Sequence, residues 1–179
     1  MRVVLYFLAT ISCTHGASMG PIGTIAIDSI YECEENVVND KFSFKLFFKT
    51  SPKDGNSLDA ELASSIPIDN DFTYEIQVVR WANSGWQPVL TRKGNVCNDL
   101  LLYLGDLFVM AAKKATPSAS PTCPIPAGTY KLEDYRASAM SFKIPVIYYG
   151  KLKATIKMSA GNEQVFCVVG EAQSQAKLF

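Results

Sequence analysis

Histidine and cysteine are the residue types in this chain that most readily do chemistry, and both are scarce. The chain has one histidine, His15, and five cysteines. Ser-His-Asp and Cys-His catalytic arrangements need an imidazole close to the nucleophile, and His15 lies in an N-terminal segment that we expect to be removed. The neighbouring carboxylates Glu34-Glu35 and Glu133-Asp134 are typical of solvated turns. The sequence therefore indicates a protein that is not an enzyme.

The N-terminal segment has the three-part pattern of a secretory signal peptide. Met1-Arg2 is basic, residues 3–11 are almost wholly apolar, and small polar residues follow up to Gly16. The apolar run is much shorter than the roughly 20 residues of a membrane-spanning helix. We expect cleavage after Gly16 and a secreted mature chain, residues 17–179, folded as one domain. The lysosome is the alternative destination.

The four cysteines that remain after such a cleavage are Cys33, Cys97, Cys123 and Cys167. They lack the close pairs of a zinc site, and an even number in an exported chain predicts disulfides. Four cysteines allow three pairings. We favour Cys33–Cys167, which would join the first and last predicted strands, and Cys97–Cys123, which would clamp the predicted helix. We expect no metal and no other cofactor.

Charge and composition narrow the classes of partner. The chain has 17 basic and 17 acidic residues, and 48% of it is hydrophobic. A nearly neutral chain gives no reason to expect nucleic acid or an anionic membrane as the main partner. A chain of this length and hydrophobic content can bury a substantial core.

Most of the chain alternates apolar and polar residues with the period of two that marks a half-buried antiparallel strand. In residues 41–49 the inward face would be Phe42, Phe44, Leu46 and Phe48. In residues 22–33 it would include Ile25, Ile27 and Tyr31. Further strands are expected at residues 72–80, 86–90, 128–132, 137–144, 148–158 and 164–170, with a loop at 51–57 and a loose tail after 170. These short strands predict an all-β, immunoglobulin-like sandwich of two antiparallel sheets.

Residues 97–114 depart from this pattern and show the apolar spacing of a helix. Asn98 or Asp99 would cap its start. Gly105 lies inside it and would weaken it by about 1 kcal/mol. The inward face of this predicted helix consists of Leu101, Leu104 and Phe108.

The second half of the chain resembles a known family. Residues 123–130 read C-P-I-P-A-G-T-Y and resemble the C-P-x-x-x-G-x-Y segment of the ganglioside-activator-like, or ML, lipid-recognition domains. Ile144-Pro145 and residues 149–154 resemble that family's paired strands. Residues 65–67, 72–81 and 96–100 extend the similarity to roughly residues 33–169, closest to the divergent branch found in insects.

The resemblance implies a two-sheet cup with one inserted helix and an apolar cavity that receives lipid between the sheets. The chain has two predicted disulfides, and the additional bridges that brace the mouth of the ganglioside activator are missing. Assistance to a ganglioside hydrolase is therefore not carried over to this chain, whereas the lipid-binding architecture is.

We thus expect a monomeric lipid-binding or lipid-transfer protein that holds an acyl chain, a glycolipid or a sterol. A hydrolase or a receptor would be its protein partner, with transient contact to membrane surfaces. The alternative is a secreted interaction module with a closed core, of a chemosensory or immune accessory kind. Residues expected to line the cavity are Phe42, Phe44, Leu46, Phe48, Ile76, Val78, Leu101, Leu104, Phe108, Phe142 and Ile156.

Overall fold

The computed structural model describes residues 18–34, 40–51, 55–82, 84–136 and 146–176 of the chain. The expected signal peptide and the strand predicted at residues 137–144 lie outside these ranges, as does Phe142.

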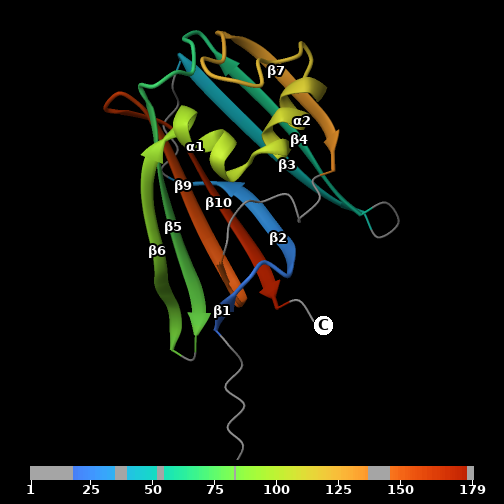
Figure 1. Cartoon of the computed structure of the whole chain (residues 1–179), viewed down its shortest axis with the longest axis vertical. Coiled ribbons are helices and arrows are strands. Elements are labelled where there is room, and N and C mark those ends of the chain that lie inside the picture. Colours follow the sequence, from blue (N-terminus) through green and yellow to red (C-terminus); the bar gives the residue numbers. More distant parts are fainter. Residues whose placement is uncertain (1–17, 35–39, 52–54, 83, 137–145, 177–179) are drawn as a thin grey trace, which may run out of the picture.

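Two antiparallel sheets form the body of the protein, which confirms the predicted all-β sandwich with a helical insertion (Figure 1). The large sheet has the order β2 (Thr24–Glu32), β10 (Glu163–Gln175), β9 (Gly150–Ala160), β5 (Phe72–Ala82) and β6 (Gly85–Asn95). The small sheet has the order β3 (Phe42–Ser51), β4 (Gly55–Ser64) and β7 (Gly128–Tyr135). Two short strands, β1 (Met19–Gly20) and β8 (Ile147–Tyr148), pair with each other, and the helices are α1 (Val96–Tyr103) and α2 (Asp106–Lys114).

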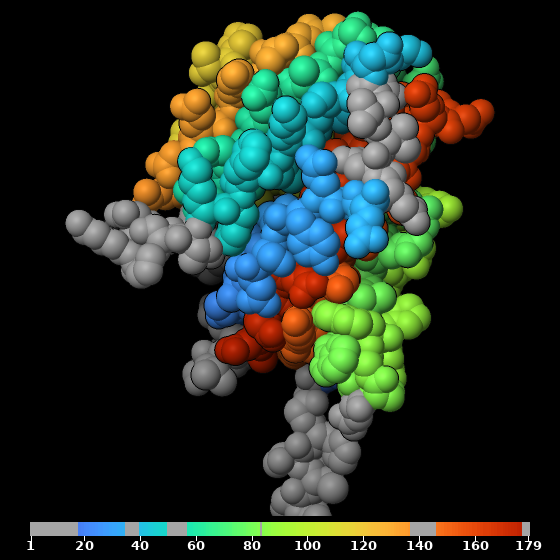
Figure 2. Space-filling model, turned by 180° about the vertical axis from the view of Figure 1, so that it is seen from behind, coloured from blue at the N-terminus to red at the C-terminus, as the bar shows by residue number. Residues whose placement is uncertain are grey.

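The two sheets approach each other along one corner and diverge from it. Strand β3 of the small sheet contacts β2 and β10 of the large sheet. On the divergent side, α1 contacts β5 and β6 while α2 contacts β7, so the helix pair lies across the gap between the sheets (Figure 1). Seen from behind, β3 and β2 run close together across the surface (Figure 2). The arrangement is a wedge whose upper opening is occupied by the helices.

The alternation predicted for β3 is confirmed. Phe42 is 3% exposed, whereas Phe47, which points the other way, is 56% exposed. The Phe42 ring lies 5.8 Å from that of Phe72 in β5, and the Phe44 ring lies 4.8 Å from that of Phe166 in β10. These contacts join the small sheet to the large one. The buried core around them is Phe42, Ile68, Phe72, Val96, Ile125, Val165, Phe166 and Val168.

Both favoured disulfide pairings are confirmed. Cys33–Cys167 joins the end of β2 to β10, and Cys97–Cys123 joins the start of α1 to the loop before β7. Next to the second bridge, Ile68 and Ile125 exchange backbone hydrogen bonds of 2.9 Å in both directions. The base of the helical insertion is therefore fixed to the chain that leads into β5.

The small sheet contains a strand that the sequence analysis missed. Residues 55–57 were assigned to a loop, but they begin β4, which pairs along its whole length with β3. The polar start of this segment resembles a turn. Beyond this start, apolar residues alternate with acidic ones and pair with the inward-facing residues of β3; they are Leu58, Ala60 and Leu62. The period of two is therefore present, but it extends over only a short segment.

The predicted single helix is two helices, so that prediction was wrong. Gly105 has φ of 45°, a left-handed conformation that glycine adopts readily, and the axis breaks there. Asn95 caps α1 by accepting a 3.1 Å hydrogen bond from the Asn98 amide, in place of the caps predicted at positions 98 and 99. Leu100 packs against the core, and Leu101 is 39% exposed.

Two further corrections concern the strands at the edge of the large sheet. The region after residue 170 is no loose tail, because β10 continues to Gln175 and pairs with both β2 and β9. A bulge in β2 between Ser29 and Ile27 shifts the register, which reverses the side to which residues point. Ile30 therefore packs against the core, while Tyr31 points outward and donates a hydrogen bond to Glu171.

The opposite orientations of Phe42 and Phe47 give a direct test of the strand's faces. Phe42→Ala should lower the free energy of unfolding by about 3–5 kcal/mol because it leaves a cavity between the sheets. Phe47→Ala removes the same atoms from an exposed position and should change it by less than about 1 kcal/mol. Urea denaturation of the purified protein measures both, and equal losses would contradict the register of β3.

The two bridges close loops of very different length, 134 and 26 residues of sequence separation. Loop-closure entropy then predicts stabilisation of about 5 kcal/mol by Cys33–Cys167 and about 3.5 kcal/mol by Cys97–Cys123. The paired alanine variants C33A/C167A and C97A/C123A, compared by denaturant unfolding, should follow this order. A larger loss in C97A/C123A would show that the helical insertion supports the core more than the chain ends do.

Candidate functional site

The apolar inner face of the large sheet extends beyond the packed core. Ile76 pairs with Ile156, and Ile156 pairs with Val168, forming one row across β5, β9 and β10. The row on the side away from the core consists of Val78, Ala154 and Gly170. Val168 belongs to the core, and Ile156 packs against it. The large sheet contacts the small sheet through this row and through the rows on its core side.

The row of Val78, Ala154 and Gly170 is built from smaller side chains and leaves space above the sheet. Among the described residues, a Cβ atom added to Gly170 would have no heavy atom within 4 Å apart from those of its chain neighbours. On the flanking strands the inner face stays apolar yet accessible, because Leu90 of β6 is 48% exposed and Ile27 of β2 is 37% exposed. Within the part of the chain that the structure describes, the inner face around Gly170 thus forms an open apolar floor, and its residues point toward the gap of the wedge.

A polar cluster fixes α1 over the β5–β6 side of this floor. The Tyr74 hydroxyl donates a 2.6 Å hydrogen bond to Asp99 of α1 and accepts one of 3.2 Å from Arg92 of β6. Arg92 also forms an ion pair with Asp99 and lies 4.6 Å from the centre of the Tyr103 ring. Burial, and then the hydrogen bond to Asp99, raise the pKa of the Tyr74 phenol. The cluster holds a neutral phenol between a cation and an anion.

Gly94 makes the room for this cluster. It lies opposite Tyr74 in the β5–β6 ladder, and a Cβ atom at this position would come within 2.8 Å of the Tyr74 ring and collide with the Asp99 carboxylate. Any larger residue would therefore displace the Asp99 carboxylate or the Tyr74 hydroxyl from this cluster.

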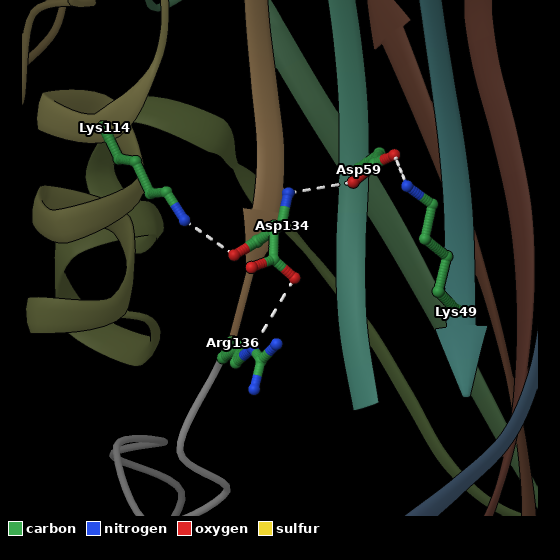
Figure 3. A network of polar contacts seen from close by, with 5 residues as sticks. All are labelled: Lys49, Asp59, Lys114, Asp134 and Arg136. Carbon is green, nitrogen blue, oxygen red and sulfur yellow. Dashed lines mark hydrogen bonds and ion pairs between the residues drawn. The ribbon is translucent and has the colours of Figure 1, made fainter. Parts of the chain in front are cut away.

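A second network fixes α2 to the edge of the small sheet (Figure 3). Lys114 donates a 2.6 Å hydrogen bond to the Asp134 carbonyl, and the Asp134 amide donates one of 2.9 Å to Asp59, which is paired with Lys49. The hydrogen bond from Lys49 lowers the pKa of the Asp59 carboxyl. The Tyr135 hydroxyl adds a 2.9 Å bond to the Leu107 carbonyl at the start of α2. Each helix is thus attached to a different sheet.

The residues predicted to line a cavity lie in different surroundings. Phe42 is in the core, and four others pack against it: Phe44, Leu46, Phe108 and Ile156. Four are half-buried outside that cluster: Phe48, Ile76, Val78 and Leu104. Leu101 is exposed. The open floor therefore includes Ile76 and Val78 from the prediction, and it adds residues that were not predicted: Ala154, Gly170, Leu90 and Ile27.

Two hollows are lined by described residues, and both are small and partly polar. One, of about 300 Å³, lies at the Phe42–Ser64–Gly128 end of the small sheet. The other, of about 390 Å³, is lined by Lys114, Thr116, Lys131 and Glu133. Neither contacts the open floor around Gly170, and their polar linings do not suit an acyl chain.

The tryptophans lie on the outer face of the large sheet and not around the gap. Trp81 and Trp86 pair across β5 and β6, with ring centres 5.3 Å apart. Lys153 lies 4.7 Å from the Trp86 ring and pairs with Glu171 at 2.9 Å. The two tryptophan rings therefore point away from the gap of the wedge.

Within the described ranges, no group of three or more potential ligand side chains could hold a metal ion. No helix in the same ranges is long and apolar enough to cross a membrane. Comparison of the sequence with models of known protein families and with curated proteins finds no match. The resemblance to the ganglioside-activator-like family remains a hypothesis based on the motif residues.

The Tyr74 cluster predicts an alkaline weakness of the fold. A phenol whose pKa is raised by folding stabilises the protein below its ordinary pKa of about 10, and this contribution is lost as pH rises through the folded-state pKa. Tyr74→Phe should lower the free energy of unfolding at pH 7 by about 1 kcal/mol, through the lost hydrogen bonds, and flatten the decline above pH 10. Urea denaturation from pH 7 to pH 11 measures both effects.

Tyr135 offers a comparison for this experiment, because burial raises the pKa of its phenol too. Tyr135→Phe should flatten the alkaline decline in the same direction. A Tyr74→Phe protein with the wild-type slope above pH 10 would show that this phenol is not protected from ionisation.

Proposed function

We propose that this protein is a secreted lipid-binding protein that holds an acyl chain, a glycolipid tail or a sterol against the inner face of the large sheet. The observation that carries the proposal is the open space above Gly170, on a face where the neighbouring residues are apolar. An apolar inner face that its own sheet partner does not cover is a favourable place for an apolar ligand.

The energetics of such a site need no catalytic group. Transfer of a lipid chain from water to an apolar surface gains about 0.8 kcal/mol per buried methylene. Leu90 and Ile27, which are accessible on the two flanking strands, would be covered by the same ligand. The two helices lie across the gap and are attached to different sheets, so a ligand could widen the wedge without unfolding either layer.

The disulfides agree with the secretory setting of the proposal. Two bridges in a chain of this size are typical of an oxidising compartment, and the expected signal peptide accounts for how the chain would reach it. A carrier of this kind collects its ligand at a membrane surface or from another protein. Transient membrane contact and delivery to a hydrolase or a receptor therefore belong to the same proposal, as does membership of the lipid-recognition family.

The test is native mass spectrometry of the protein secreted from eukaryotic cells, followed by extraction and identification of any bound lipid. Added fluorescent fatty acid, phospholipid and sterol probes then measure uptake. We expect one ligand per chain. Gly170→Phe would fill the open space and should weaken probe binding at least tenfold, while the melting temperature stays the same or rises.

Gln173→Phe is the matched control, since it adds the same ring to the same strand on its exposed outer face. It should bind probes as the wild type does. A protein that carries no lipid and takes up none of the probes would contradict the proposal and favour the alternative of a protein-binding module.

A further inference from the structure

Arg80 is the one described residue whose side chain has a buried nitrogen or oxygen with no hydrogen-bond partner. The atom concerned is its Nε. The guanidinium donates one hydrogen bond, from Nη1 to the Ser18 carbonyl, and that bond is long at 3.5 Å. A guanidinium offers five N–H donors in a fixed plane, and leaving a buried donor of a charged group without a partner is unfavourable. The position therefore lacks a complementary acceptor.

The strand register places Arg80 on the open floor's own face. It lies opposite Leu152 of β9, which is buried, and it follows Ile76 and Val78 at intervals of two along β5. From Ile76 to Arg80 the strand spans about 13 Å. Strand β1 lies at this end of the large sheet, away from the helices (Figure 1), and Ser18 next to it accepts hydrogen bonds from both Arg80 and Tyr149. Arg80 is thus a cation at the end of an apolar strip.

Neighbouring carboxylates do not neutralise this cation. Among the described residues, no aspartate or glutamate forms an ion pair with Arg80, whereas Arg92 on the same face has Asp99. Glu171 is on the outer face, with Lys151 and Lys153.

We propose that Arg80 binds the anionic headgroup, a carboxylate or a phosphate, of a lipid whose chain lies on the floor along Val78 and Ile76 toward Gly170. The inference rests on the proposed function and adds the class of ligand to it. Two oxygens of either headgroup match the parallel N–H bonds of a guanidinium. The chain of the ligand would extend from Arg80 toward the packed core, so the headgroup stays at the end of the sheet where β1 and β8 lie.

The experiment compares ligands that share one chain and differ in charge. Oleate, oleoyl lysophosphatidate and the uncharged methyl oleate displace a fluorescent lipid probe from the secreted protein. We expect the wild type to bind at least one of the two anions roughly ten- to a hundredfold more tightly than methyl oleate, as for a hydrogen-bonded charge pair. The relative affinities of oleate and the lysophosphatidate then distinguish the carboxylate from the phosphate.

Arg80→Gln should lose this preference while it still binds methyl oleate, and Arg80→Lys, which keeps the charge but not the planar fork, should retain part of it. Lys45→Gln removes a charge from the outer face of β3 and should leave all three affinities unchanged. Binding of both anions no tighter than that of methyl oleate by the wild type would overturn this inference alone, as would a preference for an anion that persists in Arg80→Gln. Binding of none of the three ligands would overturn it together with the proposed function.

Discussion

The two layers of this protein are held together by a small set of contacts along one corner. Phe42 and Phe44 of β3 reach across to Phe72 and Phe166 of the large sheet. Within the large sheet, Cys33–Cys167 fixes the end of β2 to β10. Because a sheet is rigid along its hydrogen-bonded ladders, fixing one corner sets the direction in which the rest of each layer runs. Elsewhere the right-handed twist of the sheets carries their faces apart.

The divergence of the sheets determines what the helices do. In an ordinary sandwich the inner faces cover each other over their whole area. Here α1 and α2 occupy the upper part of the opening, and each is bound by polar contacts to a different sheet, through Tyr74 and Asp99 on one side and through Lys114 and Asp134 on the other. The lower part of the large sheet keeps an apolar face with small residues and one cation, which is the basis for both proposals.

The sequence was most informative where one strong local pattern decided the structure. The alternation of phenylalanines identified the face of β3, and the positions of the cysteines at the ends of elements suggested the correct pairing. It was less informative where two patterns compete. The polar start of β4 resembled a turn, the apolar spacing ran through Gly105 although its backbone conformation ends the helix there, and the bulge in β2 reversed the side of Tyr31 without any mark in its residue types.

The open floor could not have been predicted from the sequence. Ala154 and Gly170 are ordinary small residues in strands, and their meaning depends on whether another layer covers them. Periodicity reports the direction in which a side chain points, and it contains no information about the distance to the opposite layer. In the same way Arg80 reads as the polar end of a strand, and only the register shows that it shares a face with Val78 and Ile76.

The bridge between Cys97 and Cys123 has a consequence for how this protein can change over evolutionary time. It closes the helical insertion at its base, where Ile68 and Ile125 also pair, so the chain between the two cysteines meets the sheets at fixed points. Substitutions, and even changes of length, inside that closed segment alter the helices that lie across the upper part of the gap without moving the strands that lead into and out of the segment. The part of the chain that covers the gap can thus diverge while the framework of sheets that carries it persists.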